Sequence, residues 1–158
     1  AAQPHFMEAA AAQLDVRLNS FLRGMAESFV VRSTEEGARL ELARVDDERF
    51  TVHLEHTGIS ATVVAFSFRT EGLASFFASI ARDWRGWDGE RRWASFENEV
   101  ELSATADRAG HVRLVVDVNR GWPPNGWHAR GTLLLEAGQL DSLAREAVAF
   151  EAAALRST

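Results

Sequence analysis

The sequence predicts an α+β fold, with a mostly antiparallel β-sheet of six or seven strands and three helices packed mainly on one face. Three observations support this fold class. Several segments alternate apolar and polar residues, which is the period of a half-buried strand. Three other segments repeat apolar residues at helical spacing. Turn-forming residues join most strands over hairpin lengths, which favours antiparallel pairing.

The chain has the size and composition of one globular domain. Its 158 residues include 46% hydrophobic and 25% charged residues, as is usual for such proteins. Residues 1–7 lack periodicity, so we assign them to a cloning remnant or a disordered tail. Residues 8–156 then form a single α+β domain.

An amphipathic helix is predicted over residues 8–27. Its apolar residues recur along one stripe, formed by Leu14, Leu18, Phe21, Leu22, Met25 and Phe29. Two interpretations of this stripe remain open. It packs on the sheet of its own domain, or it forms the contact of a homodimer.

Two of the predicted strands have different environments. Residues 50–55 alternate Phe50, Val52 and Leu54 with polar residues, which is typical of a strand covered on one face. Residues 59–68 are β-branched and aromatic on both faces, which predicts a central strand covered on both sides. Further strands are expected near residues 29–33, 39–42, 99–104, 112–119 and 127–135.

Two further helices are predicted from apolar stripes. The first has Thr70 as its N-cap and ends at Gly86, with the stripe Leu73, Phe76, Phe77, Ile80 and Trp84. The second begins at Gly138, with the stripe Leu140, Leu143, Ala147, Val148 and Leu155. We expect both stripes to pack against the sheet.

The composition argues against several classes of protein. The chain has no cysteine, which excludes disulfides, thiolate metal ligands and a cysteine nucleophile. No apolar run approaches the roughly 20 residues of a membrane-spanning helix. The acidic net charge of −6 argues against nucleic-acid binding. No secretory signal pattern is present, so we expect a cytoplasmic protein.

The polar residues form no recognisable catalytic or metal-binding motif. His53 and His56 are three residues apart in the predicted strand region, so they point to opposite faces and lack an evident third ligand. The acidic residues between positions 83 and 101 are expected on a solvated face. We therefore predict no catalytic residues, no metal site and no cofactor.

Residues 84–93 hold three of the five tryptophans, with two glycines and five charged residues. Trp84, Trp93 and Trp127 are predicted in the core, since they continue a helix stripe or enter strands. For the other two rings, two alternatives stay open: a binding surface in loops, or rings that fold back over the core. The candidate partner-binding residues are Arg85, Trp87, Asp88, Glu90, Trp122 and Asn125.

The polar face of the last three strands is a second candidate surface. Its candidate residues are Arg113, Asp117, His128 and Arg130, which alternate with apolar residues. If helices cover the other face, these side chains line an open, charged face that suits a protein partner better than a small apolar ligand. The alternative is a set of cross-strand charge pairs that face water.

Several segments resemble a family of small actinobacterial proteins known only as a domain of unknown function. The likeness is carried by residues 76–78, 83–89, 93, 101–105, 111–112 and 133–150. It spans about residues 38–150, and its most specific part is the Arg-Gly-Trp-Asp-Gly element at 85–89. The resemblance implies no activity.

These observations predict a non-enzymatic protein-binding module. By analogy with small actinobacterial immunity or regulatory proteins, we expect it to block a basic partner through complementary charge. The alternative is a small-ligand-binding protein or an enzyme whose tryptophan loops form a pocket. A cavity of a few hundred Å³ lined by Trp87, Trp93 and Trp122 would favour that alternative.

Overall fold

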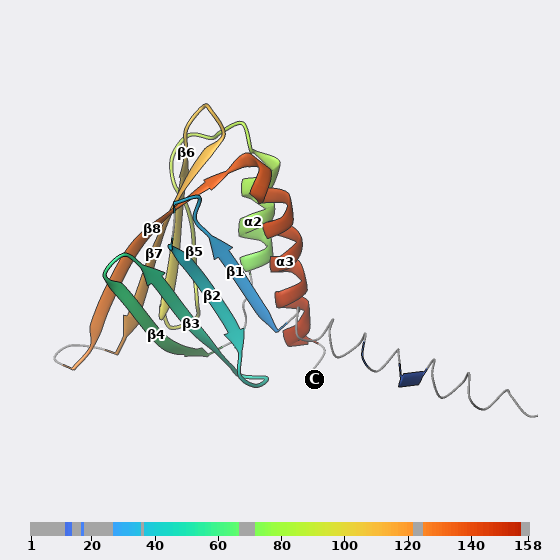
Figure 1. The fold of residues 1–158 in the computed structure, drawn as a ribbon, viewed down its shortest axis with the longest axis vertical. Helices are drawn as coiled ribbons and strands as arrows, with labels where there is room; N and C mark the ends of the chain where they lie inside the picture. Colours follow the sequence, from blue (N-terminus) through green and yellow to red (C-terminus); the bar gives the residue numbers. More distant parts are fainter. Residues whose placement is uncertain are drawn as a thin grey trace, which may run out of the picture.

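The computed structural model describes residues 12, 13, 17, 27–35, 37–66, 72–121 and 125–155. Within these ranges, eight strands form two antiparallel sheets of four strands each, with two helices beside them (Figure 1). The first sheet holds, in order, β1 (Ser28–Arg32), β2 (Arg39–Arg44), β3 (Arg49–His56) and β4 (Ile59–Phe66). The second holds β5 (Arg91–Ala94), β6 (Val100–Ala106), β7 (His111–Arg120) and β8 (Trp127–Glu136).

Within each sheet, every strand pairs with the next one along the chain, because the turns between them are short. Between β3 and β4 the turn consists of Thr57 and Gly58, and Gly58 has a φ of 75°, which glycine adopts without steric cost. On β3, Phe50, Val52 and Leu54 are buried while their neighbours are less so. The predicted alternation of this strand is therefore confirmed.

The two helices are α2 (Leu73–Arg82) and α3 (Ala137–Leu155), which lie side by side next to β1 in Figure 1. Helix α2 begins after its N-cap residue, Gly72, which has the left-handed backbone conformation. As a glycine, it provides no side-chain hydrogen bond to the first turn. The predicted N-cap Thr70 lies outside the described residues. Neither helix has the length and apolar character that a membrane-spanning segment requires.

The core joins the helices to the first sheet through aromatic contacts. Phe77 of α2 packs edge-on against Phe29 of β1, with ring centroids 5.1 Å apart. The ring of Phe150 of α3 also packs edge-on against that of Phe50 of β3, with ring centroids 6.2 Å apart. The buried residues of α2 are Leu73, Phe76, Phe77 and Ile80, as its stripe predicts.

The prediction of one sheet with six or seven strands and three helices is wrong. The described residues form eight strands in two sheets, with two helices. Alternation locates strands but does not say which strands pair, so the break between β4 and β5 is invisible in the periodicity. Strand β5 has only four residues and lies within the tryptophan-rich stretch, where glycines and charges suggested a loop.

The predicted N-terminal helix lies mostly outside the described residues. Ala12, Gln13 and Arg17 are described, and all three are helical and exposed. The packing of this helix and its use in a homodimer stay predictions.

Strand β4 is an edge strand, which corrects the prediction of a central strand over residues 59–68. Among the described strands, it pairs with β3 alone. Ala61, Val63 and Ala65 face the core, but Val64 and Phe66 are exposed. β-branched residues suit a pleated strand whether or not its second face is covered, so their presence did not report burial.

Three predicted core residues are exposed: Trp84, Trp127 and Val148. Helix α2 ends at Arg82, so Trp84 lies beyond the helix and outside its apolar stripe. Trp127 is the first residue of β8 and stands at the end of its sheet. Trp93, by contrast, is buried, which confirms its prediction.

Candidate functional site

The polar face of the second sheet carries charged side chains from several strands. One cross-strand row consists of Ala94 of β5, Glu101 of β6, Asp117 of β7 and Arg130 of β8. Apolar residues at alternate positions of these strands are buried, so this row lies on the face turned away from the core. We call the surface formed by Arg92, Glu101, Asp117, Asn119, His128 and Arg130 the Asp117 face.

Asp117 is the centre of this face. Its Oδ1 lies 2.6 Å from Nε2 of His128 and accepts a 2.7 Å hydrogen bond from Nε of Arg130, while Nη2 of Arg130 reaches Oδ2 at 3.4 Å. Asp117 is only 9% exposed, although the side chains of both partners remain largely open to solvent. The buried carboxylate of Asp117 therefore holds two exposed side chains, His128 and Arg130, in place.

The charge state of Asp117 follows from two opposing effects. Desolvation is the largest single effect, and it raises the pKa of the carboxyl. The hydrogen bonds from Arg130 and His128, together with their charges, outweigh it and lower the pKa of Asp117 below its ordinary value. The carboxylate is therefore ionised at neutral pH.

The other polar residues extend the Asp117 face in two directions. Arg92 of β5 pairs with Glu90, and this ion pair raises the pKa of Arg92 and lowers that of Glu90. Asn119 donates to Oε2 of Glu101 at 3.4 Å and to the carbonyl oxygen of Asn98 at 2.9 Å. The Asp117 face thus carries neighbouring side chains of both charges.

Three of the four strand-face candidates meet in the structure, and one does not. Asp117, His128 and Arg130 are in contact, whereas Arg113 lies four residues earlier on β7, about 13 Å along the strand. Arg92 was not a candidate, because β5 was taken for a loop. The available signal was its position directly before the buried Trp93, which places it on the opposite face of a strand.

The tryptophan-rich loop forms a clamp between α2 and β5. Arg91 donates to Oδ2 of Asp83 at 2.6 Å and to the carbonyl oxygen of Ser79 at 2.7 Å. Its guanidinium carbon lies 4.5 Å from the centroid of the Trp87 ring, a cation–π contact. Hydrogen bonds from Arg91 and then Arg82 lower the pKa of Asp83. We call Asp83, Trp87 and Arg91 the Trp87 clamp.

The Trp87 ring belongs partly to the core. It is half-buried and packs against the main hydrophobic cluster, and its Nε1 is buried without a hydrogen-bond partner among the described residues. Of the two alternatives for this ring, the geometry favours the one in which it covers the core. The other candidates in this loop, Arg85, Asp88 and Glu90, are exposed.

The tryptophan-rich loop and Gly121 lie at opposite ends of the second sheet (Figure 1). A Cβ on Gly86 would stand 2.6 Å from the carbonyl oxygen of Asp107, which lies just before β7. Gly121 directly follows the other end of β7, whose ten residues span about 33 Å. The candidates Arg85, Trp87, Asp88 and Glu90 therefore do not share one contact surface with Asn125. Asn125 is exposed, and Trp122 lies outside the described residues.

The clamp leads to a prediction about stability. We expect Trp87→Ala to lower the free energy of unfolding by about 2 kcal/mol, because it removes a half-buried ring and its contact with Arg91. Denaturant unfolding measures the change. Trp84→Ala serves as the control, since the Trp84 ring is exposed and should cost about 0.5 kcal/mol or less. Equal losses for the two variants would contradict the role of the clamp.

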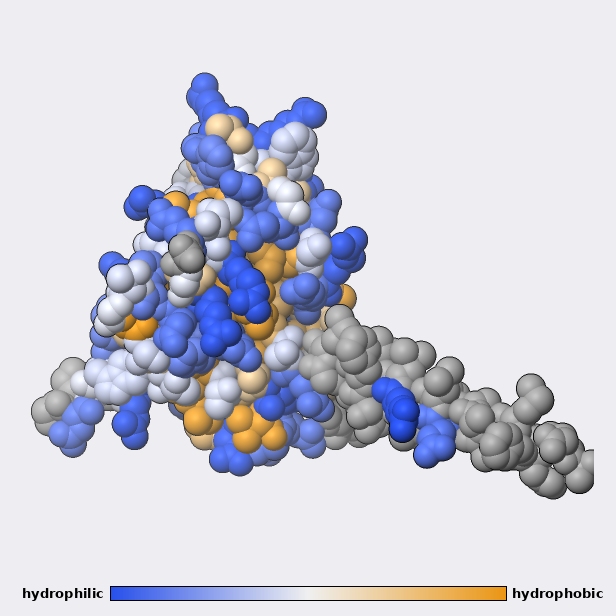
Figure 2. Space-filling view, viewed as in Figure 1, coloured by the Kyte–Doolittle hydropathy of each residue, from blue (hydrophilic) through white to orange (hydrophobic). Residues whose placement is uncertain are grey.

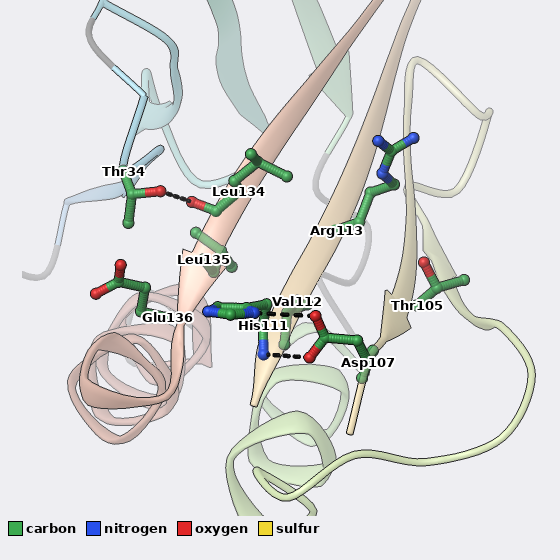
Figure 3. A pocket seen from close by; sticks show the side chains of 10 residues that line it. Thr34, Thr105, Asp107, His111, Val112, Arg113, Leu134, Leu135 and Glu136 are labelled. Carbon is green, nitrogen blue, oxygen red and sulfur yellow. Dashed lines mark hydrogen bonds and ion pairs between the residues drawn. The ribbon is translucent and has the colours of Figure 1, made fainter. Parts of the chain in front are cut away.

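The described surface contains hollows, of which two are relevant to the candidate residues. The first, of about 580 Å³, is bordered by the ends of β6, β7 and β8 and by Thr34 (Figure 3). There the His111 ring faces Asp107, with Nδ1 2.9 Å from Oδ2. Asp107 also accepts the backbone N–H groups of Ala109 and His111, so this pair closes the turn between β6 and β7.

The second hollow, of about 460 Å³, lies between β4 and the turns that follow β5 and β7. No tryptophan lines either hollow. Across the described part of the chain, no group of three or more histidine, aspartate or glutamate residues is placed to hold a metal ion. The two histidines have other partners: Nδ1 of His53 lies 2.6 Å from Oγ1 of Thr62, and Nε2 of His56 lies 3.1 Å from the carbonyl oxygen of Thr132.

The comparison with protein families places this arrangement in a known group. Residues 31–154 match a family of unknown function, DUF6228. The chain belongs to this family. Searches of curated proteins and of solved structures gave no significant match. The DUF6228 match covers the second sheet in full, so the Asp117 face and the Trp87 clamp both lie within the family region.

Proposed function

We propose that the chain is a non-enzymatic protein-binding module that contacts its partner through the Asp117 face. One observation carries the proposal: the buried Asp117 carboxylate holds Arg130 and His128 on a strand face that is otherwise open. The four strands of this sheet supply a rigid base for these groups.

The ion pairs at Asp117 suit recognition better than they suit stability. Burial of the Asp117 carboxylate costs desolvation free energy, and this cost offsets much of the attraction to Arg130 and His128, so such a pair is weak evidence for a role in stability. A partner, however, gains from side chains that are already positioned, since less conformational freedom is lost on binding. Adjacent charges of both signs also favour one orientation of the partner over others.

The charge of the whole chain supports a basic partner. A net charge of −6 attracts a cationic protein over several ångströms and speeds its association. We further propose an immunity-type or regulatory role in the cytoplasm of an actinobacterium. This finer proposal rests on the resemblance carried by the Arg-Gly-Trp-Asp-Gly element at 85–89 and on analogy with small proteins of similar build.

The alternative is a small-ligand site, and it has weaker support. Small-molecule pockets are concave and mostly apolar, with volumes of about 300–1,000 Å³. The first hollow has such a volume, but Thr34, Asp107, His111, Arg113 and Glu136 give much of its lining a polar character. Neither hollow has the tryptophan lining that the alternative requires.

A substitution at the centre of the face tests the proposal. We expect Asp117→Asn to weaken partner capture about tenfold or more, because Arg130 and His128 lose the charge that orients them. The measurement is affinity capture from cells that carry the natural gene, quantified by mass spectrometry for the wild-type protein and the variant. Thermal unfolding establishes that the variant is folded.

Asp107→Asn is the matched control, because Asp107 also holds a histidine but lies in the turn between β6 and β7. It should capture the partner as the wild-type protein does. Equal capture by Asp117→Asn, Asp107→Asn and wild type would show that the Asp117 face is not the contact surface. Capture that increases with added salt would contradict a basic partner.

A further inference from the structure

The backbone of β4 presents unpaired groups along its outer edge. The N–H of Phe66 donates to Oε2 of Glu99 at 3.0 Å, so it points away from β3. Backbone groups two residues apart point in the same direction along a strand, so those of Thr62 and Val64 also face outward. Within the described part of the chain, these outward groups have no backbone partner.

β4 lacks the features that usually protect an edge strand. Natural sheets guard their edges with charged residues, proline, bulges, short strands or a covering element. β4 has eight residues, none charged and none proline, and it pairs with β3 in eight consecutive positions without a bulge.

The other three edges of the described sheets are protected. β1 ends in Arg32 and packs beside α3. β5 has only four residues, two of them arginine. At the edge of β8, Leu134 accepts a hydrogen bond from the N–H of Thr34 and donates its own N–H to Oγ of Ser33. β4 therefore differs from the other described edges along Thr62 and Val64, while its Phe66 end is covered by the carboxylate of Glu99.

The surface beside β4 is both hollowed and apolar. The hollow of about 460 Å³ runs along this strand and is bordered by Glu97, Glu99 and Arg120. Val64 is 49% exposed and Phe66 43% exposed, and Phe96 in the turn after β5 is 73% exposed. Figure 2 shows apolar atoms at the lower end of the molecule among hydrophilic ones. Apolar exposure beside a free strand edge is typical of a strand-binding site.

We propose that the edge of β4 binds an extended segment of a partner protein as an added strand. Backbone hydrogen bonds to Thr62 and Val64 would supply affinity, and alternate side chains would supply specificity. One set would be apolar and lie over Val64 and Phe66. The other set would be basic and enter the hollow, where the carboxylates of Glu97 and Glu99 outnumber the guanidinium of Arg120.

This inference rests on the proposed protein-binding function but uses a different surface. The Asp117 face is a side-chain surface of the second sheet, whereas the β4 site is a backbone edge of the first. Each can therefore be tested with its own variants, and the loss of one leaves the other intact.

The probe is a displayed library of random ten-residue peptides, from which one selected peptide is synthesised. We expect the selected peptides to alternate β-branched or aromatic residues with arginine or lysine. Val64→Pro removes the outward N–H and should weaken peptide binding about tenfold or more. Val64→Thr keeps that N–H and the branched shape, so it should bind as wild type does. Asp117→Asn should also leave peptide binding unchanged.

Amide hydrogen exchange of the wild-type protein provides a second readout, which does not depend on the folding of a variant. In the free protein, the amides of Thr62 and Val64 should exchange rapidly, while those of Ala61 and Val63, which face β3, should be protected. Addition of the peptide should protect Thr62 and Val64. This alternation identifies an added strand.

Three results would overturn the proposal. The first is a library that yields no binder, or binders that Val64→Pro does not affect. The second is a bound peptide that leaves the amides of Thr62 and Val64 unprotected. The third is a wild-type dimer, seen by sedimentation, that Val64→Pro dissociates, since the edge would then serve a second copy of this chain. Loss of capture by Asp117→Asn alone would not affect the conclusion.

Discussion

Phe77→Ala is expected to lower the free energy of unfolding by about 3–5 kcal/mol, which is the usual cost of deleting a fully buried phenylalanine ring. Phe77 is 1% exposed, and its ring makes edge-on contacts at 5.1 Å with both Phe29 and Phe76. Alanine would therefore leave a cavity between α2 and the first sheet and would remove both ring contacts. Urea unfolding, with the slope compared between the variant and wild type, measures the loss.

Phe96→Ala is the matched control, because it is the same substitution at a ring that is 73% exposed. Its effect should stay within about 0.5 kcal/mol of zero. A Phe77→Ala protein that loses less than about 1 kcal/mol would contradict the packing of α2 against β1.

Gly86→Ala is expected to destabilise the protein by about 2–4 kcal/mol, from two causes that act together. Gly86 has a φ of 112°, which residues with a side chain rarely adopt. A Cβ at this position would also lie 2.6 Å from the carbonyl oxygen of Asp107, so the loop and the turn between β6 and β7 would have to separate. Thermal and denaturant unfolding measure the change.

Gly89→Ala separates the two causes. Gly89 belongs to the same loop and has a φ of 81°, but a Cβ there would meet nothing within 4 Å. It should lose only the conformational part, about 1 kcal/mol. If both substitutions cost the same, the close approach between Gly86 and Asp107 contributes nothing to stability.

The sequence predicted the local elements well where the periodicity was clear. The alternation of β3 and the stripe Leu73, Phe76, Phe77 and Ile80 of α2 are both present in the structure. For the candidate site, the two-residue period placed His128 and Arg130 on one face of β8, and that face carries the contact with Asp117. These features depend only on neighbours within one strand or helix, which the sequence specifies directly.

The position of the tryptophans could be predicted only in part. Trp93 is buried as expected, but Trp84 is exposed because α2 stops at Arg82. Helix ends depend on local capping, and the C-cap here is Asp83, whose N–H donates to the carbonyl oxygen of Ser79; an aspartate does not signal a helix C-terminus in the sequence. Arg91 holds the Trp87 ring by a cation–π contact and also binds Asp83, eight residues earlier in the chain. Neither contact follows from a local sequence period.

By itself, the sequence determined most of the described strands and helices, β5 excepted, and which side chains share a face, because these follow from the repeat of 2 or 3.6 residues. Only the tertiary structure decided that the strands divide into two sheets, that β4 lies at an edge and that residues 83–90 and Gly121 lie at opposite ends of the second sheet. The physical reason is that backbone hydrogen bonds are alike for every strand pair. The choice among pairs therefore depends on how the whole core packs around Phe77, Phe150 and the two sheets.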